Sequence, residues 1–274
     1  MPQPGRKSNF DRALRIAGYN WPLYAIAGTV VLLGVILAAL PLLPAWGRWL
    51  CGGGAFVAAW FAFASFGAFH WMFDRSELLS GQWLNELSPV PSRWVQVSVG
   101  LEETTLPIEA VFPAAEGKSL DLFHPALMSE PAVTRARHHK ASVLTEYAKP
   151  ESLPVEHRWA DLVVVTLAAH EIRSRPVRVC FFQELRRIAA PGARIVIVEH
   201  LRDWAAALAF GGGIFHFFPR GEWLSLGRQI GLELVQERSI TPFIQVFVYE
   251  AGSDGTGDDM KALGVAEGVP SGRG

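Results

Sequence analysis

Cysteine and charge are both scarce in this 274-residue sequence. It has only two cysteines, Cys51 and Cys180, and 19% charged residues against 50% hydrophobic ones. Two cysteines so far apart form neither a metal-binding spacing nor a disulfide framework, which indicates reduced thiols in a reducing compartment. The net charge of −1 excludes the basic footprint of a nucleic-acid-binding protein. The composition is too apolar for an average soluble domain and too charged for a many-span transporter, so we expect a protein that is part membrane and part globular.

Charged residues are absent from two long runs near the N-terminus. Residues 21–47 and 49–73 contain none, and only Arg48 separates them. Each run exceeds the ~20 apolar residues that span a hydrocarbon core. Tryptophan and tyrosine lie near the ends of the runs, where amphipathic rings favour the membrane interface. The pattern predicts a two-helix anchor in residues 21–75, with spans at 22–43 and 50–72.

The flanking charges predict the orientation of this hairpin. Residues 1–20 carry four basic side chains against one aspartate, whereas the connection carries only Arg48. By the positive-inside rule, the N-terminal segment is cytoplasmic. Two spans return the chain to the same side, so we expect the region after the hairpin to lie at the cytoplasmic face of the membrane. The tail, residues 251–274, is rich in Gly, Asp and Ser, and we expect it to be disordered.

Residues 90–250 alternate between strand and helix patterns. Residues 161–168, DLVVVTLA, form an apolar run typical of a strand buried on both faces of a parallel sheet. A helical repeat follows in residues 176–189, and then the strand RIVIVE in residues 194–199. The other expected strands are 94–99, 118–123, 142–146, 232–239 and 243–250, the last two antiparallel, and the other expected helices are 106–115 and 222–230. The alternation favours an open α/β sheet, which binds ligands at the carboxyl ends of its strands.

The segment from residue 160 to residue 200 resembles a known family. It reads ADLVVVTLAAHEI and then FFQELRRIAAPGARIVIVEH. An Asp-led apolar strand ending near His-Glu, an amphipathic helix, a Pro-Gly turn and a second apolar strand are similar to the second half of class I S-adenosylmethionine-dependent methyltransferases, in the branch that methylates quinone carbons. The resemblance implies a seven-stranded, mostly parallel Rossmann-like sheet with an antiparallel terminal hairpin.

The resemblance also implies S-adenosylmethionine as the cofactor and assigns residues to it. The family's first strand is followed by a glycine-rich loop, of which only Gly100 remains here. A Cβ at the missing glycines would crowd the backbone path, so the cofactor sits differently, is held by side chains, or is not bound. Glu102 or Glu103 is a candidate acceptor for its amino group, unless both are solvated. Asp121 matches the acidic residue for the ribose hydroxyls, or is a surface residue in a turn, and Glu146 is the candidate for the adenine end.

Polar residues follow the two most apolar strands. His170 and Glu171 come after the first of them, Glu199 and His200 end the second, and His216 lies in the segment GGGIFHFFPR. In a parallel sheet both pairs lie at one edge, where a neutral His can act as general base and a carboxylate can orient it. These residues could instead be structural. They could also hold Mn, Fe or Zn, but the spacing matches no particular metal, and we do not predict a metal site.

Together these features predict a membrane-anchored S-adenosylmethionine-dependent methyltransferase. Its acceptor would be a small lipophilic molecule at the cytoplasmic membrane face, entering beside the aromatic segment at residues 204–218. Two alternatives stay open. One is a non-catalytic binding or assembly protein that kept the fold, and the other is a metal-assisted enzyme on the same fold. The degenerate glycine loop favours both alternatives, whereas the His and Glu residues favour an enzyme.

Overall fold

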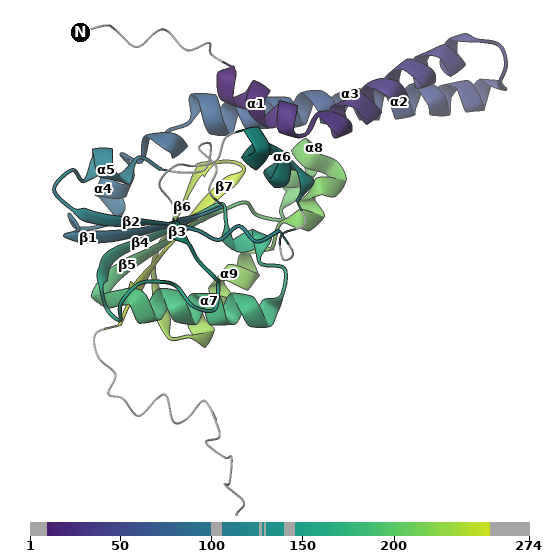
Figure 1. Cartoon of the computed structure of the whole chain (residues 1–274). Helices are drawn as coiled ribbons and strands as arrows, with labels where there is room; N and C mark the ends of the chain where they lie inside the picture. The colour runs from purple at the N-terminus through teal and green to yellow at the C-terminus, as the bar shows by residue number, and fades with distance from the viewer. Residues whose placement is uncertain (1–9, 100–105, 126–127, 129, 140–145, 253–274) are drawn as a thin grey trace, which may run out of the picture.

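A helical hairpin projects from an α/β domain built on a single sheet (Figure 1). The computed structural model describes residues 10–99, 106–125, 128, 130–139 and 146–252. The expected disorder of the tail concerns residues that, apart from 251 and 252, lie outside this described part.

The sheet has seven strands in the order β3-β2-β1-β4-β5-β7-β6. The first five strands are parallel to one another, and β7 is antiparallel to both β5 and β6. The strands are β1 (Arg93–Ser98), β2 (Glu116–Asp121), β3 (Glu146–Tyr147), β4 (Ala160–Thr166), β5 (Ala189–Glu199), β6 (Leu232–Thr241) and β7 (Ile244–Ala251). The predicted fold class, a mostly parallel seven-stranded sheet with an antiparallel terminal hairpin, is confirmed.

Both faces of the sheet are buried, which explains the continuous apolar runs in its central strands. On one face, Val163 and Val165 of β4 contact a core that includes side chains of α7 (Arg175–Ile188) and α9 (Arg220–Gln229). On the other face, Leu162 and Val164 contact a core supplied largely by the chain that leaves the hairpin. That chain forms η1 (His70–Arg75), η2 (Leu78–Ser80) and α4 (Leu84–Leu87).

The hairpin consists of α2 (Trp21–Ala39) and α3 (Ala45–Phe69), preceded by α1 (Asp11–Tyr19). Both helices of the pair are long and apolar enough to cross a membrane, and no residue in the most apolar stretch of α2 is buried inside the protein. The helices approach closely at Gly34, where a Cβ would lie 2.8 Å from the Cys51 carbonyl oxygen and 2.9 Å from the Ala55 Cβ. Close approach at small residues is typical of helices that pair in a membrane.

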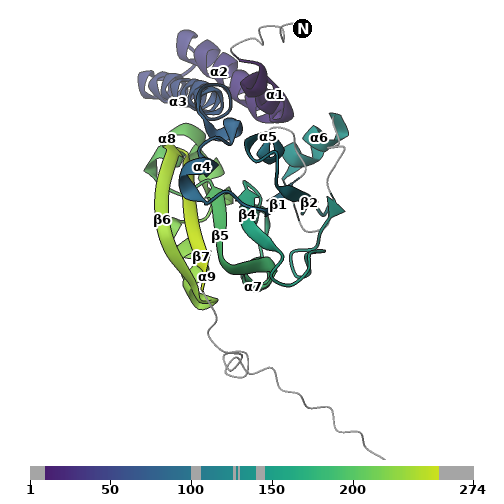
Figure 2. The same ribbon diagram turned by 90° about the vertical axis from the view of Figure 1, so that its left-hand side faces the viewer.

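A carboxylate just after the hairpin, in η1, also binds the first turn of α1. Asp74 accepts hydrogen bonds from the backbone N–H groups of Arg12 and Ala13, each at 3.1 Å. These donors belong to the first turn of α1 and have no partner within that helix, so the carboxylate satisfies them and favours the helix dipole. In Figure 2, α1, α2 and α3 lie together above the sheet, next to α8 (Trp204–Phe210).

Several boundaries differ from the sequence prediction, including the following three. The helix expected at 106–115 is reduced to α5 (Ile108–Val111), because the residue before Pro113 is driven out of the helical conformation. β2 begins at Glu116 rather than at 118. β5 begins at Ala189, so the segment Ala190-Pro191-Gly192, expected as a helix stop, lies inside the strand, which has a register shift near its start.

One tight contact between α9 and β7 generates a stability prediction. Gly227 faces Tyr249, where a Cβ would lie 2.4 Å from the ring, and the Tyr249 hydroxyl is held by the Trp223 carbonyl oxygen at 3.0 Å. We expect Gly227→Ala to destabilise the protein by about 1–3 kcal/mol through overpacking. Gly221→Ala, in the same helix with no atom within 4 Å of its Cβ, is the control and should be neutral or stabilise by up to ~1 kcal/mol.

The measurement is thermal unfolding of the full chain in mild detergent, followed by circular dichroism. Equal melting temperatures for the two variants would show that the α9–β7 packing is looser than described.

Candidate active site

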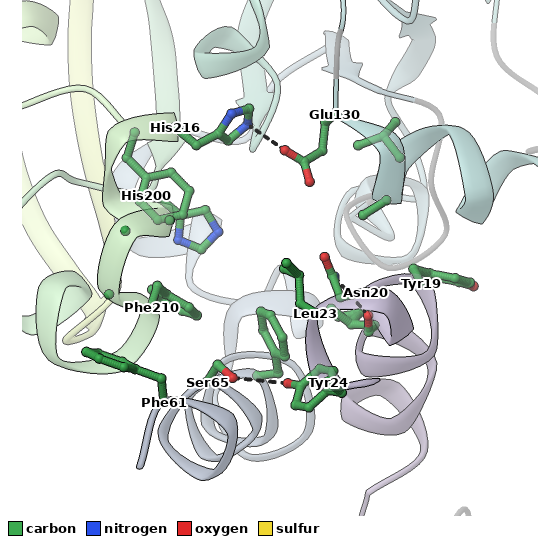
Figure 3. Close-up of a pocket in the computed structure, with 18 of the residues that line it drawn as sticks. Tyr19, Asn20, Leu23, Tyr24, Phe61, Ser65, Glu130, His200, Phe210 and His216 are labelled. Carbon is green, nitrogen blue, oxygen red and sulfur yellow. Dashed lines mark hydrogen bonds and ion pairs between the residues drawn. The ribbon is translucent and has the colours of Figure 1, made fainter. Parts of the chain in front are cut away.

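A cavity of about 660 Å³ lies between the hairpin and the carboxyl edge of the sheet. Its apolar wall includes Leu23, Ile26 and Ala27 of α2 and Phe61 and Phe69 of α3. Its opposite wall holds His170 and Glu171. His200 and His216 lie on the same wall (Figure 3). The same space is therefore bounded by the two apolar helices of the hairpin and by a group of three histidines and a carboxylate.

His170 and Glu199 form a buried pair on the sheet side of this cavity. His170 lies in the short turn η4 (Ala169–Glu171) after β4, and Glu199 ends β5. The His170 Nδ1 lies 2.5 Å from Glu199 Oε2, and Glu199 Oε1 accepts from the backbone N–H of Ala169 at 2.8 Å and of His170 at 3.2 Å. The carboxylate thus fixes both the turn and the ring. Burial disfavours the charged ring, but Glu199, Glu171 and Glu130 outweigh it and raise the pKa of His170 to about 9.

Glu171 connects His170 to His216. Its Oε1 lies 3.5 Å from His170 Nε2 and 3.2 Å from His216 Nε2, while its Oε2 is buried without any hydrogen-bond partner. Burial opposes ionisation of Glu171, but the hydrogen bond from His216 and the charge of His170 outweigh it and lower the pKa of this carboxyl. Glu130 faces the same His216 Nε2 at 3.6 Å from across the cavity (Figure 3).

His200 has the opposite electrostatic character. Its Nδ1 lies 2.9 Å from the Phe243 carbonyl oxygen, so Nδ1 carries the proton and Nε2 is left as an acceptor. Burial, and then the positive charge of His170, lower the pKa of His200 to about 3. The ring leans on Phe217, with centroids 4.7 Å apart. His200 is therefore neutral near pH 7, whereas His170 is charged.

Two arginines hold the loop that brings His216 to this site. Arg173 donates to the carbonyl oxygens of His170 at 3.2 Å and of His216 at 2.5 Å. Arg202 donates to the carbonyl oxygens of Phe217 at 2.9 Å and of Phe215 at 3.2 Å. These bonds satisfy the backbone of η5 (Gly211–His216) and its end, and they fix the loop against the turn after β4.

The five residues predicted as catalytic are brought together in the structure. His170, Glu171, His200 and His216 line the cavity, and Glu199 lies directly behind His170. The residues predicted for the cofactor are not in this group. Gly100, Glu102 and Glu103 lie outside the described residues. Glu146 is exposed in β3, opposite Leu120 of β2, and it does not line the cavity.

Asp121 lies at the carboxyl end of β2, as predicted, but its carboxylate already has partners. Oδ1 accepts from the Phe123 N–H at 2.8 Å, and Oδ2 lies 2.6 Å from Arg137 Nη1. The same Arg137 nitrogen donates to the Val99 carbonyl oxygen at 2.8 Å, so this side chain of α6 (Pro131–His139) links the ends of β1 and β2. The position fits a ribose diol, but a diol would have to share the carboxylate with Arg137.

Sequence reasoning missed Glu130, Arg137, Arg173 and Arg202. Glu130 lies in an irregular segment, and the three arginines carry no periodic or spacing signal. Their roles depend on carbonyl oxygens and carboxylates that are distant in sequence, such as the Asp121–Arg137 pair. Only the tertiary structure could reveal them.

No protein-family model matches the sequence, and no curated protein matches it. Among solved structures, the chain is similar to a SAM-dependent methyltransferase from Aquifex aeolicus, at 14% identity over 64% of this chain and 91% of that chain, with a TM-score of 0.48. It is also similar to one from Methanosarcina mazei, at 14% identity over 62% and 97%, with a TM-score of 0.47. A third, from Mesorhizobium loti, has 16% identity over 62% and 98%, with a TM-score of 0.43. The strand order and the antiparallel terminal hairpin give this chain the α/β methyltransferase fold.

Proposed function

We propose that this protein is a membrane-anchored methyltransferase that uses S-adenosylmethionine to methylate a small lipophilic acceptor at the cytoplasmic face of the membrane. One observation carries the proposal. A single cavity joins helices that are able to span a membrane to a group of histidines and carboxylates at the carboxyl edge of a methyltransferase-fold sheet.

The apolar wall supports a lipophilic acceptor. Leu23 and Ile26 line the cavity and are still 65% and 61% exposed, so the cavity continues onto the outer surface of α2. In a bilayer, that surface would face hydrocarbon. An acceptor with an apolar tail could leave its tail among the lipids and place its reactive head beside the histidines, without an aqueous step that costs ~0.8 kcal/mol per exposed CH₂.

The polar wall supports proton and charge control on the acceptor. His200 Nε2 can accept a hydrogen bond from a hydroxyl group of the molecule to be methylated. The Phe243 carbonyl oxygen keeps the proton of His200 on Nδ1, which leaves Nε2 without one. His170 presents Nε2–H beside it, with ring centroids 6.0 Å apart, and its other nitrogen is anchored by Glu199. A donor and an acceptor on one wall can orient a hydroxyl and stabilise the oxyanion that forms when it loses its proton.

The cofactor supplies an electrophilic methyl group when it is bound. Asp121 is the residue we propose for its ribose hydroxyls. It stands at the end of β2, and its carboxylate keeps further acceptor capacity beyond the bonds from Phe123 and Arg137. That same ion pair is the specific observation favouring a second candidate, a non-catalytic binding protein in which Arg137 has replaced the cofactor as the partner of Asp121.

Calorimetry with S-adenosylmethionine and its demethylated product separates these two candidates. For a methyltransferase we expect binding by the full chain, and a loss of affinity of roughly 10- to 100-fold in Asp121→Asn, since hydrogen bonds to a charged group contribute about 1.5–3 kcal/mol. Asp161→Asn is the matched control. Asp161 also bonds backbone N–H groups, of Ser92 and Arg93, but it lies at the opposite edge of the sheet.

Absence of any binding heat in the wild type would remove the methyltransferase proposal and leave the binding protein. Equal affinities for Asp121→Asn and Asp161→Asn would place the ribose elsewhere.

The membrane anchor makes a topology prediction. In a variant lacking Cys51 and Cys180, a cysteine at Leu42, in the α2–α3 connection, should react with a membrane-impermeant maleimide added to intact cells. A cysteine at Gly252 should react only after the membrane is permeabilised, because the basic N-terminal segment keeps both ends of the hairpin in the cytoplasm. Labelling of the Gly252 position from outside, or a soluble protein after cell lysis, would contradict the anchor as proposed.

The acceptor route makes a separate prediction. Ala27 lines the cavity, whereas Ala25 is exposed on α2 and does not line it. We expect Ala27→Phe to lower kcat/KM for methyl transfer into the lipid-extractable fraction by about tenfold or more, because ~1.5–3 kcal/mol of apolar contact is lost to the acceptor. Cofactor affinity should stay unchanged, and Ala25→Phe should behave as wild type. Equal activities of the two variants would show that the acceptor does not pass α2.

A further inference from the structure

Two separate segments of the chain bring three metal-ligating side chains to one point of the cavity wall. His170 and Glu171 come from the turn after β4, and His216 comes from η5. One ligand atom from each of the three lies within 4.8 Å of the other two. His170 and Glu171 are 6% and 3% exposed, so the group lies inside the protein and is not a cluster of surface residues.

The distances between these atoms match a coordination shell. Metal–nitrogen and metal–oxygen bonds of about 2.1 Å at tetrahedral angles place neighbouring ligand atoms about 3.4 Å apart. Glu171 Oε1 lies 3.5 Å from His170 Nε2 and 3.2 Å from His216 Nε2. A hydrogen bond between Glu171 and His216 accounts for the second distance. Both imidazole nitrogens, however, face the same carboxylate oxygen, and neither provides a partner for the other oxygen, Oε2.

The other carboxylate oxygen is the observation that points to a ligand. Glu171 Oε2 is buried and has no hydrogen-bond partner. An unsatisfied buried carboxylate oxygen costs several kcal/mol unless something binds it. Among the described residues, only the histidines form ion pairs with Glu171, and neither lysine nor arginine does. Glu130, at 3.6 Å from His216 Nε2, supplies a fourth ligand, with an oxygen donor, at the open side of the group.

The hydrogen bonds of His170 are those expected of a histidine that binds a metal ion. A ligating imidazole typically donates its other N–H to a carboxylate, which fixes the tautomer and directs the free nitrogen at the ion. His170 Nδ1 lies 2.5 Å from Glu199, which is fully buried and also held by two backbone N–H groups. Arg173 fixes the backbone of His216 in the same way that Glu199 fixes the turn.

We propose that His170 Nε2, Glu171 and His216 Nε2, with Glu130 at the open side, bind a divalent first-row transition ion. Two imidazoles and a carboxylate suit Zn²⁺, Mn²⁺, Fe²⁺ or Co²⁺, whereas Mg²⁺ and Ca²⁺ prefer shells made only of oxygen. His170, Glu171 and His216 leave a fourth position on the cavity side, which is taken by the Glu130 carboxylate or by an external oxygen atom that displaces it. If the proposed function also holds, that position takes the acceptor's hydroxyl and lowers its pKa. The ion then replaces the His170 Nε2–H in this role, because a metal-bound Nε2 carries no proton. The binding itself does not depend on that function.

The test is titration of the chelator-treated full chain in detergent with Co²⁺, followed by calorimetry and by visible absorption. We expect one ion per chain, d–d absorption bands, and affinity at least tenfold lower in Glu171→Gln and in His216→Asn, the minimum for loss of a direct ligand when outer partners alone contribute 10- to 100-fold. His157→Asn removes an exposed loop histidine and is the control. Mg²⁺ should bind at least tenfold more weakly than Co²⁺.

Circular dichroism checks that each variant is folded. The His216 side chain is 25% exposed, so His216→Asn tests the site without a change in the buried core. The proposal is overturned if the wild type binds Co²⁺ no more tightly than His216→Asn, or if His157→Asn has the same effect as His216→Asn. Because cofactor binding is measured separately on the same preparations, loss of the metal site and loss of the methyltransferase function give different results.

Discussion

The packing of the hairpin's base against one face of the sheet is the constraint on which the rest of the structure depends. A parallel sheet must be covered on both faces, and here the second face is covered by the chain that continues directly out of α3. Met72, Leu78 and Trp83 are at most 2% exposed in that core, and each such side chain contributes about 1.5–3 kcal/mol by burial. The apolar helices therefore cannot stand apart from the sheet as an anchor on a free linker. They are held across its carboxyl edge, and the cavity is the space that this arrangement leaves.

A second constraint operates inside the cavity wall. Glu199 is buried at the end of β5 and is neutralised by His170 and by two backbone N–H groups, so it decides the shape of the turn after β4 and the direction of the His170 ring. The position of Glu199 also gives the two neighbouring histidines, His170 and His200, pKa values shifted in opposite directions. Three carboxylates stabilise the protonated form of His170, whereas His200 stays neutral beside it. Two identical side chains on adjacent strands thus acquire opposite hydrogen-bonding roles, one as donor and one as acceptor.

The ends of β1 and β2, where we propose that the cofactor binds, differ from the part of the edge that holds the histidines. At the ends of β1 and β2, Arg137 binds both the Val99 carbonyl oxygen and the Asp121 carboxylate. The negative charge of Asp121 is therefore already matched by a residue of the same chain. In the proposed methyltransferase, the cofactor would therefore compete with Arg137 for this carboxylate rather than fill an open position. Near the ends of β4 and β5, in contrast, Glu171 Oε2 has no hydrogen-bond partner.

The sequence by itself determined the elements that local pattern can specify. Charge-free runs longer than a bilayer identified both helices of the hairpin, and apolar runs such as DLVVVT and RIVIVE identified strands buried on two faces. The order of strands and turns also placed His170, Glu171, Glu199 and His200 at one edge, because parallel strands share a direction. It misjudged the short helix before Pro113 and the start of β5, where one proline and one register shift outweighed the helical pattern. What only the tertiary structure decided was everything that depends on partners far apart in the chain. These include the covering of the sheet by residues after α3, the pairing of Arg137 with Asp121, and the arrival of His216 and Glu130 opposite Glu171. No periodicity encodes such contacts, because they arise from the packing of separate segments rather than from the conformation of any one of them.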